Sequence, residues 1–470
     1  MMIETKRRGR MFFLAFGCLA LAASGAIAKQ GIDEGRLKIL AKTLDEYVEQ
    51  EKLAGGVLYL SRNGKPVLHK AFGWQDREDE IPMEKRSLHR IASQTKALTS
   101  AAIMILQERG QLLINDELGK YFPEWRETMV AVESSNKAEG YKIVPAKRSI
   151  TIRDLLTHTA GVNYGWGLAQ REWKESSIIG WYFAGDEESM RSKVRRMASL
   201  PHAAHPGEAF VYGYNTDILG ALVEEISGQT LGVFLDENIF SPLGMKDTYF
   251  FVPGDKAKQL STVYALTEDG LRRAPSKDQV GTEPNGSNTL FYYGQGHYLE
   301  DSISGNRSYS GGAGAVSTAK DYALFLEMLL NDGESNGRRI LSRKSVELMI
   351  QNHLDPQIPY RSGSGFGLGF NIVTNLGQFG SMGTEGAYGW GGAYHSTYWV
   401  DPEEELVVSY VTQLIPAGNS DDHGKMRFLL LRAMVKMRMR RLVLRFFRFV
   451  SCGVMSAQSI EPVARFAELL

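Results

Sequence analysis

Hydrophobic residues first recur at helical spacing in residues 35–51. This pattern predicts a helix that carries one apolar face, formed by Leu37, Leu40, Leu44 and Val48. Two β-rich runs follow, at residues 55–61 and 66–73, on either side of Asn63-Gly64. An Asn-Gly pair between two such runs predicts a β-hairpin.

Helical patterns dominate residues 93–237, including the segments 151–158 and 217–226. Residues 255–311 have weak periodicity and many Gly, Asn, Ser and Tyr residues, so we expect long loops and short strands near a cleft. A further helix is predicted to begin at Ser317, as its N-cap, and to run through Leu330. Strand patterns return at residues 366–373, 397–400 and 406–411.

Strands therefore lie at both ends of the chain and helices lie between them. This order predicts an α/β fold of the α+β type, in which both chain ends build one antiparallel sheet flanked by helices. A mostly helical part would be inserted between the two chain segments that build this sheet. We expect one domain over residues 30–430, with the α/β part at about 30–90 and 311–430 and the helical and loop part at about 91–310.

The amino-acid composition does not change this fold prediction. The chain has 470 residues, of which 43% are hydrophobic, and 54 basic residues balance 54 acidic ones. No global charge therefore favours a nucleic-acid partner.

The first 28 residues have the pattern of an export signal. A basic stretch at residues 6–10 precedes an apolar stretch at about 11–23, and Ala26-Ile27-Ala28 fits a cleavage site. We therefore expect a periplasmic or secreted protein, with an uncleaved membrane anchor as the alternative. After cleavage only Cys452 remains, so no disulfide can form within one chain.

The tail at residues 431–470 is unusual because its first half is basic. Arginine and lysine alternate with apolar residues over 432–448, without an acidic residue. This segment is a candidate amphipathic helix for contact with an anionic membrane surface, and a solvated helix or an unstructured extension is the alternative.

The segment Ser93-Gln94-Thr95-Lys96 carries the strongest chemical signal. It opens an apolar helical run, and residues three apart share a helix face, so Lys96 lies beside the Ser93 hydroxyl. A serine becomes a nucleophile when a base takes its proton, and a lysine can do so only if burial and nearby charge lower its pKa. Other Ser-x-x-Lys matches, at Ser134 and Ser317, fit a polar loop and a helix N-cap better.

Two further segments could complete a site. In the first, Pro206-Gly207 begins an aromatic loop that contains Tyr212 and Tyr214 and precedes a helix. Tyr212 is a candidate for proton transfer, and a core tyrosine is the alternative. In the second, the glycines around Trp390 would permit a close backbone approach and leave an N–H aimed at a substrate oxygen, although a plain glycine turn explains them equally well.

Together these segments resemble the serine β-lactamase and penicillin-binding-protein superfamily, over about residues 37–425. The resemblance is greatest to the class C-like branch that contains family VIII carboxylesterases and related transesterases. It extends to the segments 154–161, 311–318 and 325–331.

The resemblance implies that Ser93 is acylated and that Lys96 accepts its proton. Tyr212 matches the family's tyrosine base, and Trp390-Gly391-Gly392 occupies the place of the usual Lys-Thr-Gly. The backbone N–H groups of Ser93 and Ala393 would form the oxyanion hole. Tyr214, Trp390, Gly391 and Gly392 are predicted to contact the substrate.

The chain departs from the family pattern at two positions. Tyr214 stands where the family has asparagine, and Trp390 stands where β-lactamases and peptidases have a cation. Loss of that cation favours neutral esters over carboxylated lactams or peptides. We therefore expect a carboxylesterase for small esters, with a β-lactamase or D-Ala-D-Ala carboxypeptidase as the alternative.

A non-catalytic envelope protein of the same fold is the rival from another class. The family base leaves His158 and His395 no evident catalytic role, so we expect both to be structural. The sequence contains no metal-ligand motif or phosphate-binding glycine loop, and it implies no cofactor. The oligomeric state stays open.

Overall fold

The computed structural model describes residues 30–136, 140–178, 183, 185–186, 188–274 and 306–435. The predicted signal peptide and the basic interval 436–448 lie outside the described residues. The chain divides into a larger unit, Leu40–Leu431, and a smaller unit made of Met1–Ile39 and Arg432–Leu470. In the described part of the smaller unit, Ile32 pairs with Met434 as an antiparallel bridge.

An eight-stranded antiparallel sheet, in the order β14-β15-β16-β17-β18-β1-β2-β3, forms the centre of the larger unit. The N-terminal part of the chain supplies β1 (Gly55–Arg62), β2 (Lys65–Asp76) and β3 (Ile81–Pro82). The C-terminal part supplies β14 (Ser364–Phe366), β15 (Asn371–Val373), β16 (Tyr388–Gly392), β17 (Ser396–Asp401) and β18 (Leu406–Thr412). β1 pairs with β18, which confirms the predicted sheet built from both chain ends.

The β1–β2 hairpin shows how local sequence produces part of this sheet. Asn63 and Gly64 both adopt left-handed conformations, with φ of 55° and 67°. This turn twists in the same sense as the strands that it joins, and Asn and Gly tolerate positive φ best. The predicted hairpin is confirmed.

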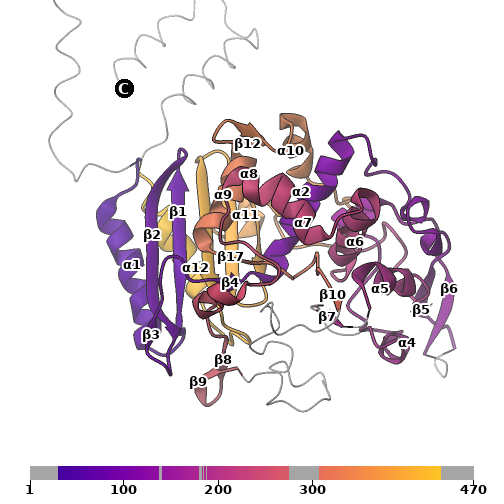
Figure 1. Ribbon diagram of the computed structural model, residues 1–470, viewed down its shortest axis with the longest axis horizontal. Coiled ribbons are helices and arrows are strands. Elements are labelled where there is room, and N and C mark those ends of the chain that lie inside the picture. The colour runs from indigo at the N-terminus through magenta and orange to yellow at the C-terminus, as the bar shows by residue number, and fades with distance from the viewer. Residues whose placement is uncertain are drawn as a thin grey trace, which may run out of the picture. The chain divides into compact units, whose positions relative to one another are not determined.

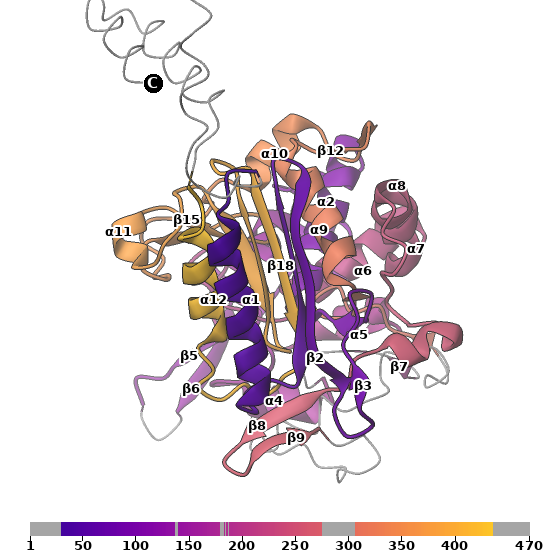
Figure 2. The ribbon, with the colours of Figure 1, turned by 90° about the vertical axis from the view of Figure 1, so that its left-hand side faces the viewer.

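Helices cover both faces of the sheet (Figures 1 and 2). α12 (Asp422–Leu431) and residues 40–49 of α1 (Glu34–Glu49) lie on one face. α9 (Ala319–Leu330) packs on the other face, against β1 and β18, with α2 (Thr95–Glu108) and α6 (Asn215–Ser227) beyond it. Every residue of α2 from Thr95 to Leu106 is buried, so α2 is a central core helix.

The segment between the two halves of the sheet is mostly helical and irregular, as predicted. Its other α-helices are α3 (Ile152–Leu156), α4 (Gln170–Glu175), α5 (Met190–Met197), α7 (Leu231–Leu235) and α8 (Ser241–Leu243). It also has the short 3-10 helices η1 (Ala92–Gln94), η2 (Leu118–Lys120), η3 (Pro123–Trp125) and η5 (Gly254–Gln259), and the π-helix η4 (Asp236–Phe240). It also contains a hairpin that the sequence did not predict, β5 (Met129–Glu133) with β6 (Tyr141–Pro145).

Short strand pairs and two small helices complete the described secondary structure. These are β4 (His89–Arg90) with β11 (Val316–Ser317), β7 (Gly185–Asp186) with β10 (Asn306–Arg307), β8 (Tyr264–Thr267) with β9 (Gly270–Arg273), β12 (Glu334–Ser335) with β13 (Arg338–Arg339), α10 (Arg343–Met349) and α11 (Leu376–Phe379).

Two predicted boundaries were wrong. The run 366–373 is not one strand, because the chain reverses between β14 and β15, where Gly369 has a φ of 98°. The N-cap of α9 is Thr318, whose hydroxyl accepts from Asp321 N at 3.1 Å. Ser317 lies in β11 and bonds Thr248 Oγ1 instead.

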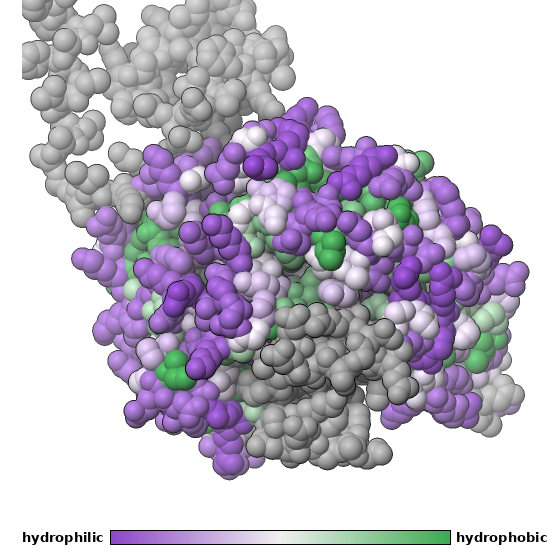
Figure 3. Space-filling view, viewed as in Figure 1, coloured by the Kyte–Doolittle hydropathy of each residue, from purple (hydrophilic) through white to green (hydrophobic). Residues whose placement is uncertain are grey.

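On the face of the protein seen in Figure 3, the described residues are mostly hydrophilic, and apolar residues form small separate patches. Among the described helices, none alone is long and apolar enough to cross a membrane; Asn215–Ser227 and Leu231–Leu243, which meet at 83°, pass that test only as a pair.

Candidate active site

Ser93 lies in the single turn η1, at the entrance to α2. It is half-buried, whereas its neighbours Ala92 and Gln94 are buried. Ala92 has a φ of 42°, a left-handed conformation that is strained for a residue with a side chain. This turn leads into α2, and Ser93 lies in the wall of a cleft.

Lys96 lies on the first turn of α2 and is only 2% exposed. Its ammonium donates to Ser93 Oγ at 3.2 Å, to Gly312 O at 2.7 Å and to Tyr164 OH at 3.3 Å. A lysine ammonium has three donors, and these contacts use all of them. The structure therefore brings together Ser93 and Lys96, as the sequence predicted.

A buried carboxylate lies behind Lys96. Asp217 is fully buried on α6 and accepts from Ser310 Oγ at 2.6 Å and from Gly312 N at 3.1 Å. Burial raises the pKa of Asp217, while the nearby Lys96 charge opposes this shift. The backbone of Gly312 thus connects the two groups, since its N–H donates to Asp217 and its carbonyl accepts from Lys96.

Tyr212 lies in the loop before α6, next to Lys96. The centre of its ring is 4.7 Å from Lys96 Nζ, and its hydroxyl accepts from Trp390 Nε1 at 3.2 Å. Tyr164 packs edge-on against Tyr212, with ring centres 5.9 Å apart. Burial, with smaller effects from Tyr212 and Asp217, raises the pKa of Tyr164 well above its ordinary value, so Tyr164 stays a protonated phenol.

The glycines of β16 allow this strand to approach the turn that carries Ser93. A Cβ on Gly392 would lie 2.4 Å from Ile91 O and 2.5 Å from Ser396 Oγ, distances that real side chains do not adopt. Ala393 follows directly and packs partly buried against a cluster that contains Ala92. The backbones next to Ser93 and Ala393 are therefore neighbours.

These residues line a cleft of about 710 Å³. Its walls contain Ser93, Tyr212, Trp390, Gly391, Gly392 and Ala393, which were predicted from the sequence, and also Phe210, Arg361, Asn371, His395, His423 and Arg427. The cleft combines a half-exposed hydroxyl with aromatic walls, and Lys96 lies directly behind that hydroxyl. This arrangement suits acyl transfer to Ser93.

Tyr214, which was predicted to contact the substrate, does not line the cleft. It is fully buried, and its ring packs between Trp173 and Phe183, with ring centres 5.7 and 5.4 Å away. It also meets Tyr164 edge-on at 4.9 Å. The physical reason is that Tyr164, Trp173 and Phe183, which are distant from Tyr214 in the chain, form an aromatic environment around its ring.

His158 is fully buried behind Tyr212. Burial, with a smaller effect from Lys96, lowers the pKa of His158 well below its ordinary value, so the ring is neutral. Its Nδ1 is 3.0 Å from Asn215 Nδ2, which also donates to Val162 O and Val211 O. These contacts fix the loop that carries Tyr212, a structural role.

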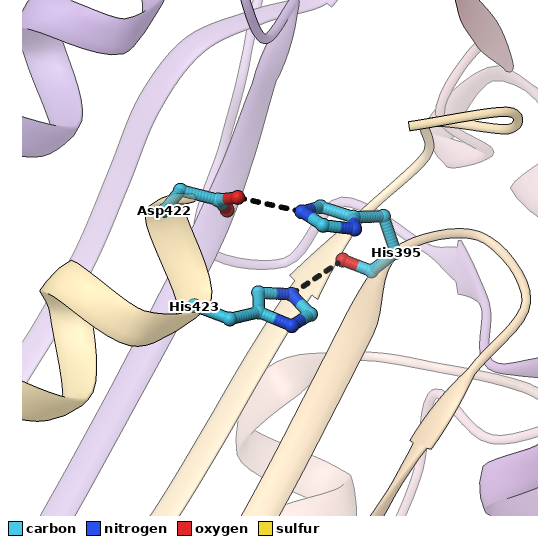
Figure 4. A group of neighbouring side chains, drawn as sticks. All are labelled: His395, Asp422 and His423. Carbon is cyan, nitrogen blue, oxygen red and sulfur yellow. Dashed lines mark hydrogen bonds and ion pairs between the residues drawn. The ribbon is translucent and has the colours of Figure 1, made fainter. Parts of the chain in front are cut away.

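His395, Asp422 and His423 form a cluster (Figure 4), and both histidines of this cluster line the cleft. His395 Nε2 lies 2.6 Å from Asp422 Oδ1, and His423 Nε2 lies 3.2 Å from His395 O. Burial raises the pKa of Asp422, but the hydrogen bond and charge of His395 outweigh it and hold that pKa well below its ordinary value. Asp422 also accepts from Tyr410 OH at 2.8 Å.

The donor atoms of this cluster lie within 4.8 Å of one another, close enough to surround a metal ion. However, the two imidazole rings are stacked 4.0 Å apart and the contacts above join the residues to each other. His395 also has a φ of 57°, and its carbonyl accepts from Thr412 Oγ1 at 2.5 Å. We therefore assign the cluster to holding the turn that follows β16.

Sequence reasoning missed Tyr164, Asp217 and the Gly312 carbonyl as neighbours of Lys96. Gly312 lay in a segment noted for its family resemblance, but no spacing rule connects it with Lys96. Tyr164 and Asp217 are distant in the chain from Ser93, and the fold alone brings them to it.

The comparisons with known proteins agree with this geometry. The family model described as Beta-lactamase matches residues 40–430. Protein Rv1367c of Mycobacterium tuberculosis is 30% identical over 387 residues, which cover 80% of this chain and 89% of that protein. Esterase EstB of Burkholderia gladioli is 28% identical over 393 residues, which cover 81% of this chain and 91% of that protein.

Among solved structures, EstCE1, a hydrolase with promiscuous acyltransferase activity, has a TM-score of 0.69 at 24% identity. The match covers 85% of this chain and 99% of that chain, and it shows a shared fold. With a family match across residues 40–430 and a Ser-x-x-Lys pair opening a buried core helix, the chain belongs to the β-lactamase family, as a serine hydrolase.

Proposed function

We propose that this protein is a secreted carboxylesterase that cleaves small esters through an acyl-enzyme on Ser93. The observation that carries the proposal is the 3.2 Å contact between the half-exposed Ser93 hydroxyl and the buried Lys96 amine. The relationship to esterase EstB supports the substrate class. Secretion rests on the signal pattern of residues 1–28.

In the proposed mechanism, the Lys96 ammonium first loses one proton to solvent, because only an amine with a free lone pair can accept the proton of Ser93. Ser93 Oγ attacks the ester carbonyl while its proton passes to Lys96, and Tyr212 then relays a proton from Lys96 to the leaving oxygen. The N–H groups of Ser93 and Ala393 bind the negative oxygen of the tetrahedral intermediate. The intermediate collapses, the ester C–O bond breaks, and the proton goes to the leaving alcohol. Water then attacks the acyl-enzyme, the bond from the acyl carbon to Ser93 Oγ breaks, and one proton of the water returns through Lys96 to Ser93 Oγ as the acid is released.

Ser93→Ala tests the nucleophile. We expect it to abolish labelling by a serine-reactive fluorophosphonate, since Ser93 is the proposed nucleophile, while the thermal unfolding curve stays near that of wild type. Ser317→Ala is the matched control, because Ser317 also precedes a lysine by three residues but is buried in β11. Labelling retained by Ser93→Ala would refute the assignment.

The relative turnover of an ester and a β-lactam tests the proposed substrate class. The relationship to esterase EstB favours esters over β-lactams and D-Ala-D-Ala peptides. We expect faster turnover of a short-chain p-nitrophenyl ester than of a chromogenic cephalosporin. A strong preference for the cephalosporin would favour a β-lactamase, and absence of any acyl-enzyme by mass spectrometry would favour a non-catalytic envelope protein.

A further inference from the structure

Arg361 brings a positive charge to the wall of the active-site cleft. Its guanidinium carbon lies 4.8 Å from the centre of the Trp390 ring, and both residues line the cleft that contains Ser93. Trp390 Nε1 donates to Tyr212 OH at 3.2 Å. Trp390 therefore contacts both the Arg361 guanidinium and the Tyr212 hydroxyl.

The loop that carries Arg361 is held in place. Tyr360 OH donates to Asn371 Oδ1 on β15 at 3.1 Å, and the Tyr360 ring packs against Phe210 with centres 4.7 Å apart. Arg361 O accepts from Ser364 N at 3.0 Å, at the start of β14. The backbone beneath the guanidinium is thus anchored to the sheet that forms the cleft wall.

The protein does not neutralise this charge. Among the described residues, Arg361 forms no ion pair with an aspartate or glutamate, and it is exposed. No aspartate or glutamate of the described chain lines the cleft, whereas two arginines do. An anion that enters the cleft therefore meets positive charge without a competing carboxylate.

Arg427, the second arginine of the cleft, is already engaged with the protein. Its Nε donates to Met382 O at 2.9 Å, and its guanidinium carbon lies 4.8 Å from the Trp399 ring centre. It is also half-buried. This contrast singles out Arg361 as the cation that can meet a ligand.

We propose that Arg361 binds a carboxylate of the substrate, so that the preferred ester carries a negatively charged group in addition to its scissile bond. A guanidinium stacked on an aromatic face keeps its N–H edge available for a two-point contact with a carboxylate. The proposal rests on the proposed esterase function and narrows it. It also reverses the expectation that Trp390 makes the site prefer neutral esters, because the loop before β14 supplies the missing charge.

The test compares two matched esters: mono-4-nitrophenyl glutarate, which is anionic, and its methyl ester, which is neutral. We expect wild type to have the higher kcat/KM for the anionic ester. Arg361→Gln should lower the anionic-to-neutral ratio of kcat/KM about tenfold, through KM, as expected for one charge-assisted contact. Arg361→Lys should give an intermediate ratio, and higher ionic strength should reduce the wild-type ratio.

Arg338→Gln is the matched control, because Arg338 is an exposed arginine on β13 that does not line the cleft. It removes the same charge and should keep the wild-type ratio. A wild-type ratio near one, or equal losses for both esters in Arg361→Gln, would overturn the inference while esterase activity stands. Hydrolysis of neither ester would overturn the proposed function and the inference together.

Discussion

Lys96 is held by groups from separate parts of the chain. Ser93 precedes it by one helical turn, Tyr164 follows α3, and Gly312 precedes β11. Because Lys96 is buried, rotation of the amine away from these partners would leave polar groups unsatisfied, which costs about 1–3 kcal/mol per group. Each contact therefore helps keep the amine beside the Ser93 hydroxyl.

Tyr214 and Trp390 give a residue-scale prediction about what touches substrate. Tyr214→Phe should leave KM for a p-nitrophenyl ester unchanged, because the ring lies in the core. Trp390→Phe removes the hydrogen bond to Tyr212 and should lower kcat/KM about tenfold. Steady-state kinetics measure both, with melting curves as the control for folding. A raised KM in Tyr214→Phe would restore it as a substrate contact.

At the scale of elements, the site depends on how β16 meets η1. β16 pairs with β15 and β17, and its glycines leave no side chain between the strand and Ile91 O. The turn after the strand is fixed by α12, through the contact of His395 with Asp422. The sheet thus positions Ala393 against the start of α2.

Gly392→Ala tests this contact between elements. The new Cβ would lie 2.4 Å from Ile91 O, so β16 must move away from η1. Loss of one oxyanion donor lowers kcat by roughly 10²–10³-fold, and we expect a loss of this order. Gly424→Ala on α12 is the control for exchanging glycine for alanine, because a Cβ there meets nothing within 4 Å. Near-normal kcat in Gly392→Ala would exclude Ala393 from the oxyanion hole.

At the scale of the whole molecule, several histidines are buried as neutral rings. Burial lowers the pKa of His89 to about 3 and that of His202 to about 4. Burial and the neighbouring His395 lower the pKa of His423 to about 4. Unfolding exposes these rings to water, where a histidine has a pKa of about 6.5.

This difference predicts acid sensitivity. Between the folded and unfolded pKa values the unfolded chain binds more protons, so the free energy of unfolding falls as the pH falls below about 6.5. The loss approaches about 1.4 kcal/mol per pH unit for each such histidine. Chemical denaturation at pH 7 and at pH 5 measures it. Equal stability at the two values would show that these rings are not buried neutral, and His202→Gln should reduce the difference.

Local patterns predicted the elements that local physics controls. The Asn63-Gly64 turn, the apolar face of α1 and the helix that begins beside Ser93 all depend on residues close together in the chain. The break between β14 and β15 was missed, because a short apolar run does not show where the chain reverses. Tyr214 was placed wrongly because its environment comes from Trp173 and Phe183.

The amino-acid sequence by itself determined the fold class and the Ser93–Lys96 pair, because helical spacing places residues three apart on one face. Tertiary structure alone decided which distant groups surround that pair: Asp217 and Tyr164 behind Lys96, and Arg361 above Trp390. The physical reason is that packing of the sheet against the helical part brings these groups together, and the linear order of the residues does not encode those distances.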